Sequence, residues 1–191
     1  MPYESREVKN CLARLDQDKL ILLDIDTDFP GKDCAVVHQD FLGGTEACLE
    51  SARVPIARYK RMELVLHKDG VQIPEGIRTA CKRFCKRHGI PLAVSVNFDP
   101  KQLERGTVYC VIDDTDLVAL IAEMHRRKFV AGEDVGIISY NDTAMKTIVE
   151  GGVTVMSTDF CAMGAAAAEK VLDRSKSRTL IPTSLIVRRT L

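Results

Sequence analysis

The feature that most constrains the fold of this chain is an alternation of short apolar runs and helical stripes between residues 61 and 139. The apolar runs predict strands, and the stretches with an apolar residue every three or four positions predict helices. In order along the chain, the expected strands and helices lie at residues 61–66, 76–88, 92–96, 107–112, 115–127 and 135–139. Strands that alternate with helices form βα units, so we expect a doubly wound, mainly parallel sheet.

The clearest of these elements is the helix at residues 76–88, which ends at Gly89, a residue typical of helix C-termini. Its apolar positions fall on one face, which we expect to pack against the sheet: Ile77, Ala80, Cys81, Phe84 and Cys85.

The remaining elements are shorter or less regular. Further strands are expected at 19–25, 34–37 and 184–187, and further helices at 4–16, 44–52 and 160–172. Thr45 is the expected N-cap of the helix at 44–52. Few strands precede residue 54, so we expect apolar side chains of the flanking helices to be poorly buried there: Val8, Leu12, Leu15, Met163 and Val171.

Composition limits the classes of function. The 191 residues contain 27 Lys and Arg against 27 Asp and Glu, a formal charge of zero. A protein that binds nucleic acid by itself usually carries a basic excess. No apolar run approaches the roughly 20 residues of a membrane helix. The polar, acidic start does not resemble a signal peptide, so we expect a cytoplasmic protein.

The seven cysteines form no C-x-x-C pair. Cys81 and Cys85 lie one helical turn apart, with His88 on the same face, but a fourth metal ligand is missing. We therefore expect reduced, mostly buried thiols, no metal and no cofactor.

Polar and aromatic residues follow the expected strands where each strand ends. Ligands of open α/β sheets bind at the carboxyl ends of the strands, and carboxylates, amides and rings together suit a polyhydroxylated ligand. Any one of these Asp or Asn residues is more simply explained as a helix cap, but the set as a whole favours a binding site. The candidate ligand-binding residues are Asp40, Phe41, Asp113, Asn141 and Phe160.

Five segments in order resemble the ligand-binding domains of LacI-family regulators. The longest, Val130–Asp142, reads VAGEDVGIISYND. The others are Val36–Gly44 (VVHQDFLGG), Asp113-Asp114, Val155–Gly164 (VMSTDFCAMG) and Thr183–Thr190 (TSLIVRRT). In addition, GIRTACKRFCKRHGI resembles sugar-binding domains fused to GntR-type winged helices.

The resemblance implies an α/β fold of the type I periplasmic-binding-protein kind, with two parallel-sheet lobes and a ligand in the cleft between them. It implies an incomplete N-terminal lobe of residues 1–54 and 157–174, and a C-terminal lobe of residues 60–153 and 180–191. It places ligand contacts on Asp40, Asp113, Asn141 and Phe160. One departure is Ile77, which stands where the family usually has an Arg that binds sugar hydroxyls.

The function that the resemblance implies is sensing of a sugar or sugar phosphate by part of a transcription regulator, without enzyme activity. The full-length regulator would be a homodimer that binds DNA through a domain absent from this chain. A stand-alone sugar-binding protein is an alternative.

A third hypothesis for the function is a phosphatase. It comes from Asp24-Ile25-Asp26-Thr27-Asp28, which is similar to the D-x-D-x-T/V motif of haloacid-dehalogenase-like phosphatases. In that reading Asp24 would be the nucleophile and Asp113-Asp114 would bind magnesium. The fifth residue departs from the motif.

Overall fold

The computed structural model describes residues 6–26, 34–68 and 75–191. The chain forms two compact units. The small unit comprises Met1–Asp40 and Thr158–Thr183, and the large unit comprises Phe41–Ser157 and Ser184–Leu191.

A six-stranded sheet with the order β4-β3-β5-β6-β7-β9 forms the centre of the large unit. β3 pairs in parallel with both β4 and β5, and β5–β6 and β6–β7 are parallel as well. The strands are β3 (Arg61–Leu66), β4 (Leu92–Val96), β5 (Thr107–Val111), β6 (Gly136–Tyr140), β7 (Thr154–Thr158) and β9 (Thr183–Ile186). The predicted parallel α/β sheet is confirmed.

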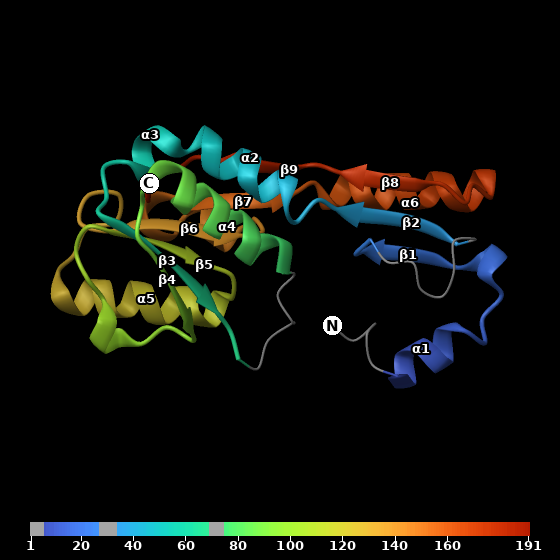
Figure 1. The fold of residues 1–191 in the computed structure, drawn as a ribbon, viewed down its shortest axis with the longest axis horizontal. Coiled ribbons are helices and arrows are strands. Elements are labelled where there is room, and N and C mark those ends of the chain that lie inside the picture. Colours follow the sequence, from blue (N-terminus) through green and yellow to red (C-terminus); the bar gives the residue numbers. More distant parts are fainter. Residues whose placement is uncertain (1–5, 27–33, 69–74) are drawn as a thin grey trace. The chain divides into compact units, whose positions relative to one another are not determined.

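Helices cover both faces of this sheet (Figure 1). On one face, α2 (Gly43–Ser51), α3 (Arg53–Ile56) and α4 (Glu75–His88) share a core with the sheet, and α5 (Asp114–Arg127) packs on the other. Successive side chains of a β-strand point to opposite faces of the sheet, so neighbouring residues of one strand pack into different cores. Ile138 belongs to the α4 side, and Ile137 to the α5 side.

The prediction for α4 is confirmed. The helix ends at His88, and Gly89 follows with a φ of +66°. All five residues of its predicted apolar face are buried, and Phe84 is 0% exposed. Cys81 and Cys85 are therefore core residues, while His88 contacts the carboxylate of Glu50 at 3.0 Å.

The prediction for Thr45 is wrong. Helix α2 begins at Gly43, with Leu42 in the N-cap position and no side-chain cap. Thr45 therefore falls inside the helix and is fully buried. Its Oγ1 has no hydrogen-bond partner among the residues that the structure describes.

The small unit contains a parallel sheet of three described strands, β1 (Ile21–Asp24), β2 (Ala35–Gln39) and β8 (Arg178–Ile181), in the order β1-β2-β8. Its helices are α1 (Arg6–Leu12), the short η2 (Gln17–Lys19) and α6 (Phe160–Asp173). β8 was not predicted, because only Ile181 of its four residues is buried and no apolar pattern marks it.

Burial in the small unit is uneven, as expected from its few strands. α1 has no fully buried residue, and Leu15 and Val171 are 52% and 64% exposed. Met163 contradicts the expectation, since it is buried against Val37 and Ile181.

The boundary between the units differs from the expected one. Residues 41–54 were expected in the N-terminal lobe, whereas the structure places them in the large unit. The reason is that α2 packs on the same core as α4, through side chains such as Leu49.

The C-terminal segment is an integral part of the large unit. Ile137 N donates to the carbonyl of Thr190 at 2.7 Å, and the Thr190 hydroxyl accepts from Thr154 N at 2.9 Å. Gly132 lies against this segment with a φ of +80°, and a Cβ there would stand 2.2 Å from the carbonyl oxygen of Arg189. Only glycine satisfies both conditions.

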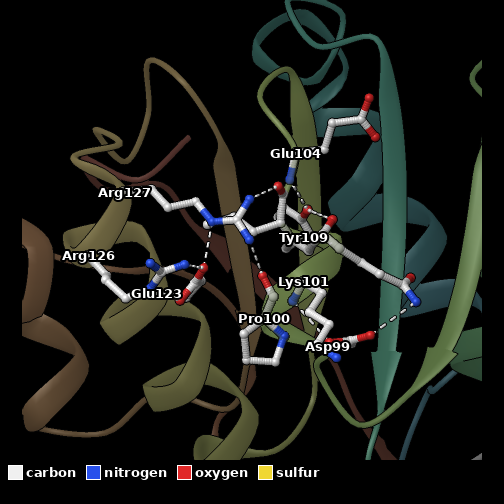
Figure 2. A network of polar contacts seen from close by, with 10 residues as sticks. Asp99, Pro100, Lys101, Glu104, Tyr109, Glu123, Arg126 and Arg127 are labelled. Carbon is white, nitrogen blue, oxygen red and sulfur yellow. Dashed lines mark hydrogen bonds and ion pairs between the residues drawn. The ribbon is translucent and has the colours of Figure 1, made fainter.

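A polar network fastens the C-terminal end of α5 to the loop before β5 (Figure 2). Glu123 accepts hydrogen bonds from Arg126 and Arg127, and Arg127 also donates to the carbonyl of Leu103 at 2.9 Å. Asp99 caps the adjoining turn η3 (Pro100–Gln102) by accepting from Lys101 N at 3.0 Å. This network lies at the amino end of β5.

All seven cysteines are free thiols. Cys11 and Cys161 are exposed, while the other five cysteines are buried free thiols. No helix among the described residues is long and apolar enough to cross a membrane.

Two short turns, η4 (Met145–Thr147) and η5 (Val149–Gly151), complete the large unit.

Candidate functional site

The connectivity of the large sheet defines where a ligand would bind. From β3 the chain passes through α4 to the edge strand β4, then crosses to β5 on the other side of β3. Such a reversal of strand order leaves a crevice at the carboxyl ends of the two strands concerned. His67 follows β3 at this point, and Asp113 follows β5.

His67, Asp113 and Asp116 form a compact cluster at this point, with ligand atoms within 4.8 Å of one another. His67 Nδ1 lies 2.8 Å from Asp116 Oδ2 and 3.9 Å from Asp113 Oδ1. The second oxygen of Asp116 accepts from Phe98 N at 2.8 Å. Asp116 thereby joins the ends of β3 and β4 to α5, so the cluster has a structural role that needs no metal.

Asp113 is the N-cap of α5, because its carboxylate accepts a hydrogen bond from Thr115 N at 2.8 Å. Partial burial tends to raise the pKa of Asp113. The hydrogen bonds from Thr115 and the nearby His67 and Lys146 outweigh that effect, so the pKa lies below its ordinary value. The side chain is therefore a charged acceptor at the crevice. Capping and ligand binding are compatible, since a carboxylate accepts several hydrogen bonds.

Asn141 follows β6, the neighbour of β5, and adopts a φ of +58°. Its backbone N donates to Met156 O at 2.8 Å. Its side-chain Oδ1 is buried without a hydrogen-bond partner among the described residues. A buried, unsatisfied acceptor costs about 1–3 kcal/mol, which a donor from a ligand would offset.

Lys146 holds the loop that carries Asn141. Its side chain is 4% exposed, and Nζ donates to the carbonyls of Tyr140 and Asn141 at 2.9 Å each. It also lies 2.7 Å from Asp114 Oδ1. This lysine connects the ends of β5 and β6. No sequence pattern predicts its role, because its partners are mostly backbone atoms.

Phe41 belongs to the same unit as Asp113 and Asn141. Its ring is stacked on that of Tyr140, at a centroid distance of 6.5 Å and an interplanar angle of 29°. On α4, Gly76 packs closely against Phe41, since a Cβ there would stand 3.0 Å from the Phe41 backbone. The structure thus brings Phe41, Asp113 and Asn141 to the carboxyl edge of one sheet.

Asp40 and Phe160 belong to the small unit, at the carboxyl edge of its own sheet. Asp40 follows β2, and Phe160 begins α6 with 47% of its surface exposed. Asp159 caps α6 by accepting from Ala162 N at 2.9 Å. Asp40 and Phe160 are thus positioned by separate elements of one unit.

A buried polar chain, which sequence reasoning missed, lies at the same edge of the small sheet. Gln39 donates to the carboxylate of Asp24 and accepts from the hydroxyl of Thr158 at 2.6 Å. Thr158 is also 3.2 Å from the hydroxyl of Thr183. Asp24, proposed above as a phosphatase nucleophile, is therefore engaged by a neutral amide, and Asp28 lies outside the described residues.

Asp142, next to Asn141, has a structural role. It pairs with both terminal nitrogens of Arg188, at 2.9 and 2.6 Å. This pairing lowers the pKa of Asp142 below its ordinary value. It joins the segment VAGEDVGIISYND to the closing segment TSLIVRRT, two of the motifs that carried the resemblance.

The architecture, parallel α/β sheets with polar residues at their carboxyl edges, is that of periplasmic binding proteins and the regulators related to them. The family model of the periplasmic binding protein-like domain matches residues 56–191. The chain belongs to this family.

Solved structures of LacI-type regulators share the fold. A transcription regulator-like protein from Staphylococcus haemolyticus has a TM-score of 0.74 at 15% identity, covering 97% of this chain and 79% of that one. A periplasmic binding protein/LacI regulator from Alkaliphilus metalliredigens, complexed with D-xylulofuranose, has a TM-score of 0.72 at 10% identity, covering 89% and 69%. A LacI-family regulator from Arthrobacter, complexed with lactose, gives 0.72 at 14%, covering 90% and 70%. A search of curated protein sequences found no match.

Proposed function

We propose that this chain is the effector-sensing part of a transcription regulator that acts in the cytoplasm, and that its effector is an uncharged sugar. The family and the fold support the regulator class, and structures with this fold include complexes with D-xylulofuranose, cellobiose and lactose. The observation that carries the proposal is the pair Asp113 and Asn141 at adjacent strand ends beside the point where strand order reverses.

The roles follow from the chemistry of each side chain. Asp113 accepts hydrogen bonds from sugar hydroxyls, and the unsatisfied Oδ1 of Asn141 accepts another. Phe41 covers an apolar face of the sugar ring. Asp40 and Phe160 offer an acceptor and an exposed ring at the carboxyl edge of the small unit's own sheet. These are the five residues that the sequence predicts to bind the ligand.

Charge favours an uncharged sugar over a sugar phosphate. Next to Asp113 lies the carboxylate of Asp116, and Lys146 is already engaged by three oxygen atoms. A phosphate bound at Asp113 would face the like charges of the two carboxylates. Neutral hydroxyls have no such cost.

Regulation would follow from a population shift. An effector that binds one conformation more tightly increases the population of that conformation. In the full-length regulator, a homodimer with a separate DNA-binding domain, the same coupling free energy would change the affinity for DNA. No catalytic step is part of this function.

Calorimetry on the 191-residue chain tests the proposal, with neutral pentoses, hexoses and disaccharides compared with pentose and hexose phosphates. We expect saturable binding of at least one neutral sugar and about tenfold weaker binding by Asp113→Asn. Asparagine preserves the cap and removes only the charge. Asp99→Asn, the same exchange at another cap, is the matched control and should bind normally. Binding of phosphorylated sugars alone, or of no sugar, would contradict the proposal.

A further inference from the structure

A cavity lies at the amino edge of the small sheet, opposite the carboxyl edge that carries Asp40 and Phe160. It has a volume of about 490 Å³ and includes Ile21 and Ala35, the first residues of β1 and β2, among its walls. Asp40 and Phe160 lie at the carboxyl edge of the same parallel sheet, so the cavity is separate from the proposed sugar site. Its size is within the range of small-ligand pockets, roughly 300–1,000 Å³.

The walls of this cavity carry more positive than negative charge. The basic residues are Lys19, Lys170, Arg174 and Lys176, and the acidic ones are Asp16 and Asp18. Both carboxylates are paired, Asp16 with Lys19 at 3.3 Å and Asp18 with Lys176 at 2.5 Å.

Lys170 and Arg174, one helical turn apart at the end of α6, are the two cations that remain. Within residues 6–26, 34–68 and 75–191, neither has a carboxylate partner. The side chain of Lys170 lines the cavity and is only 6% exposed. Its Nζ donates to the Ser177 hydroxyl at 2.7 Å, and Ser177 is 2.8 Å from the hydroxyl of Ser175.

A buried ammonium with a neutral hydroxyl as its partner is an unusual arrangement. Burying a charge is costly unless an opposite charge or several hydrogen bonds compensate it. An ammonium has three donors, and the Ser177 hydroxyl takes one of them. The guanidinium of Arg174 adds a forked donor suited to an oxyanion, and the Ser175 hydroxyl adds another polar group to the wall.

We propose that this cavity binds a small phosphate-bearing anion, either inorganic phosphate or the phosphate group of a metabolite. Lys170 is the buried anchor, and Arg174 binds the phosphate oxygens from the rim. A tetrahedral oxyanion has enough acceptors for the ammonium, the guanidinium and a hydroxyl together. The chain thus has a second, anionic ligand whose site is distinct from that of the sugar.

Calorimetry with inorganic phosphate at constant ionic strength tests the proposal, with ribose 5-phosphate as the second probe. We expect saturable binding of phosphate to the 191-residue chain. Arg174→Gln should weaken binding about tenfold without lowering the melting temperature, because Arg174 is exposed. Lys128→Gln is the matched control, since Lys128 is the left-handed C-cap of α5 as Arg174 is of α6. It should bind phosphate normally.

A second variant separates binding from folding. Lys170→Met keeps the apolar stem and removes the charge, so phosphate should no longer raise the melting temperature of this variant. If Lys170 serves only to bind the C-terminal carbonyls of α6, neither phosphate probe will bind the parent protein. Titration up to about 10 mM would reveal even millimolar affinity. Absence of binding at that concentration overturns the proposal. The proposal is also overturned if duplex DNA binds the parent protein but not Arg174→Gln, while inorganic phosphate and ribose 5-phosphate do not bind.

Discussion

At the scale of single residues, two asparagines share a left-handed backbone and differ in their hydrogen bonds. The φ angle is +58° at Asn141 and +61° at Asn97. The Oδ1 of Asn141 has no hydrogen-bond partner among the described residues, whereas the Oδ1 of Asn97 accepts a hydrogen bond from Lys68 N at 2.8 Å. Glycine adopts this conformation without strain. We expect Asn141→Gly to weaken sugar binding about tenfold and to leave stability unchanged or slightly higher.

Asn97→Gly is the control for that variant. It removes a hydrogen bond that is satisfied within the protein, so we expect it to lower the free energy of unfolding by about 1 kcal/mol and to leave sugar affinity unchanged. Calorimetry and urea denaturation measure the two effects. If Asn141→Gly destabilises the protein and binds sugar normally, Asn141 has no role in binding.

At the scale of elements, α4 owes its position to one buried face. Phe84 is 0% exposed within the core that α4 shares with β3, β5 and β6. We expect Phe84→Ala to lower the free energy of unfolding by about 3–5 kcal/mol, through lost burial and the cavity left behind. Lys86→Ala, on the exposed face of the same helix, should change it by less than about 0.5 kcal/mol. Equal denaturant midpoints for the two variants would refute the assignment of the buried face.

The end of α5 depends on an ion pair that responds to pH. The hydrogen bond from Arg126, with that from Arg127, lowers the pKa of Glu123 from 4.5 to about 2. A carboxyl with a lowered pKa in the folded protein stabilises it above the unfolded pKa and loses that effect as the pH falls toward 2. Glu123→Gln should therefore be less stable than the parent at pH 7, and the difference should vanish near pH 2. Glu133→Gln, at an exposed site in the same unit, is the control variant. A difference between Glu123→Gln and the parent that stays constant between pH 7 and pH 2 would contradict the account.

At the scale of the whole molecule, the two units differ in how much core supports them. The buried clusters of the small unit contain three residues each, Leu22, Cys34 and Val36 in one and Val37, Met163 and Ile181 in the other. The large unit has two extensive cores. Amide hydrogen exchange should show lower protection in β1, β2 and β8 than in β3, β5 and β6, because regions with little burial open at lower free energy. Uniform protection across both sheets would contradict this expectation.

Much of the large unit could be predicted because its information is local. The 3.6-residue period of α4 and the apolar runs of β3, β5 and β6 repeat within a few residues, so the sequence alone indicates the elements, their order and the parallel sheet. The same reasoning placed Asp113 and Asn141 at strand ends. Because carboxyl ends of neighbouring parallel strands share an edge, their proximity followed from the topology.

Other features depend on partners far apart in the sequence, and only the tertiary structure decides them. β8 pairs with β2 across more than half of the chain, and residues 41–54 belong to the large unit because α2 packs on α4. The ion pair of Lys146 with Asp114 and the hydrogen bond of Lys170 to the Ser177 hydroxyl likewise arise from folding. A sequence pattern records which face of an element is apolar, but a hydrogen bond or a charge imbalance is set by what the folded chain brings next to each group.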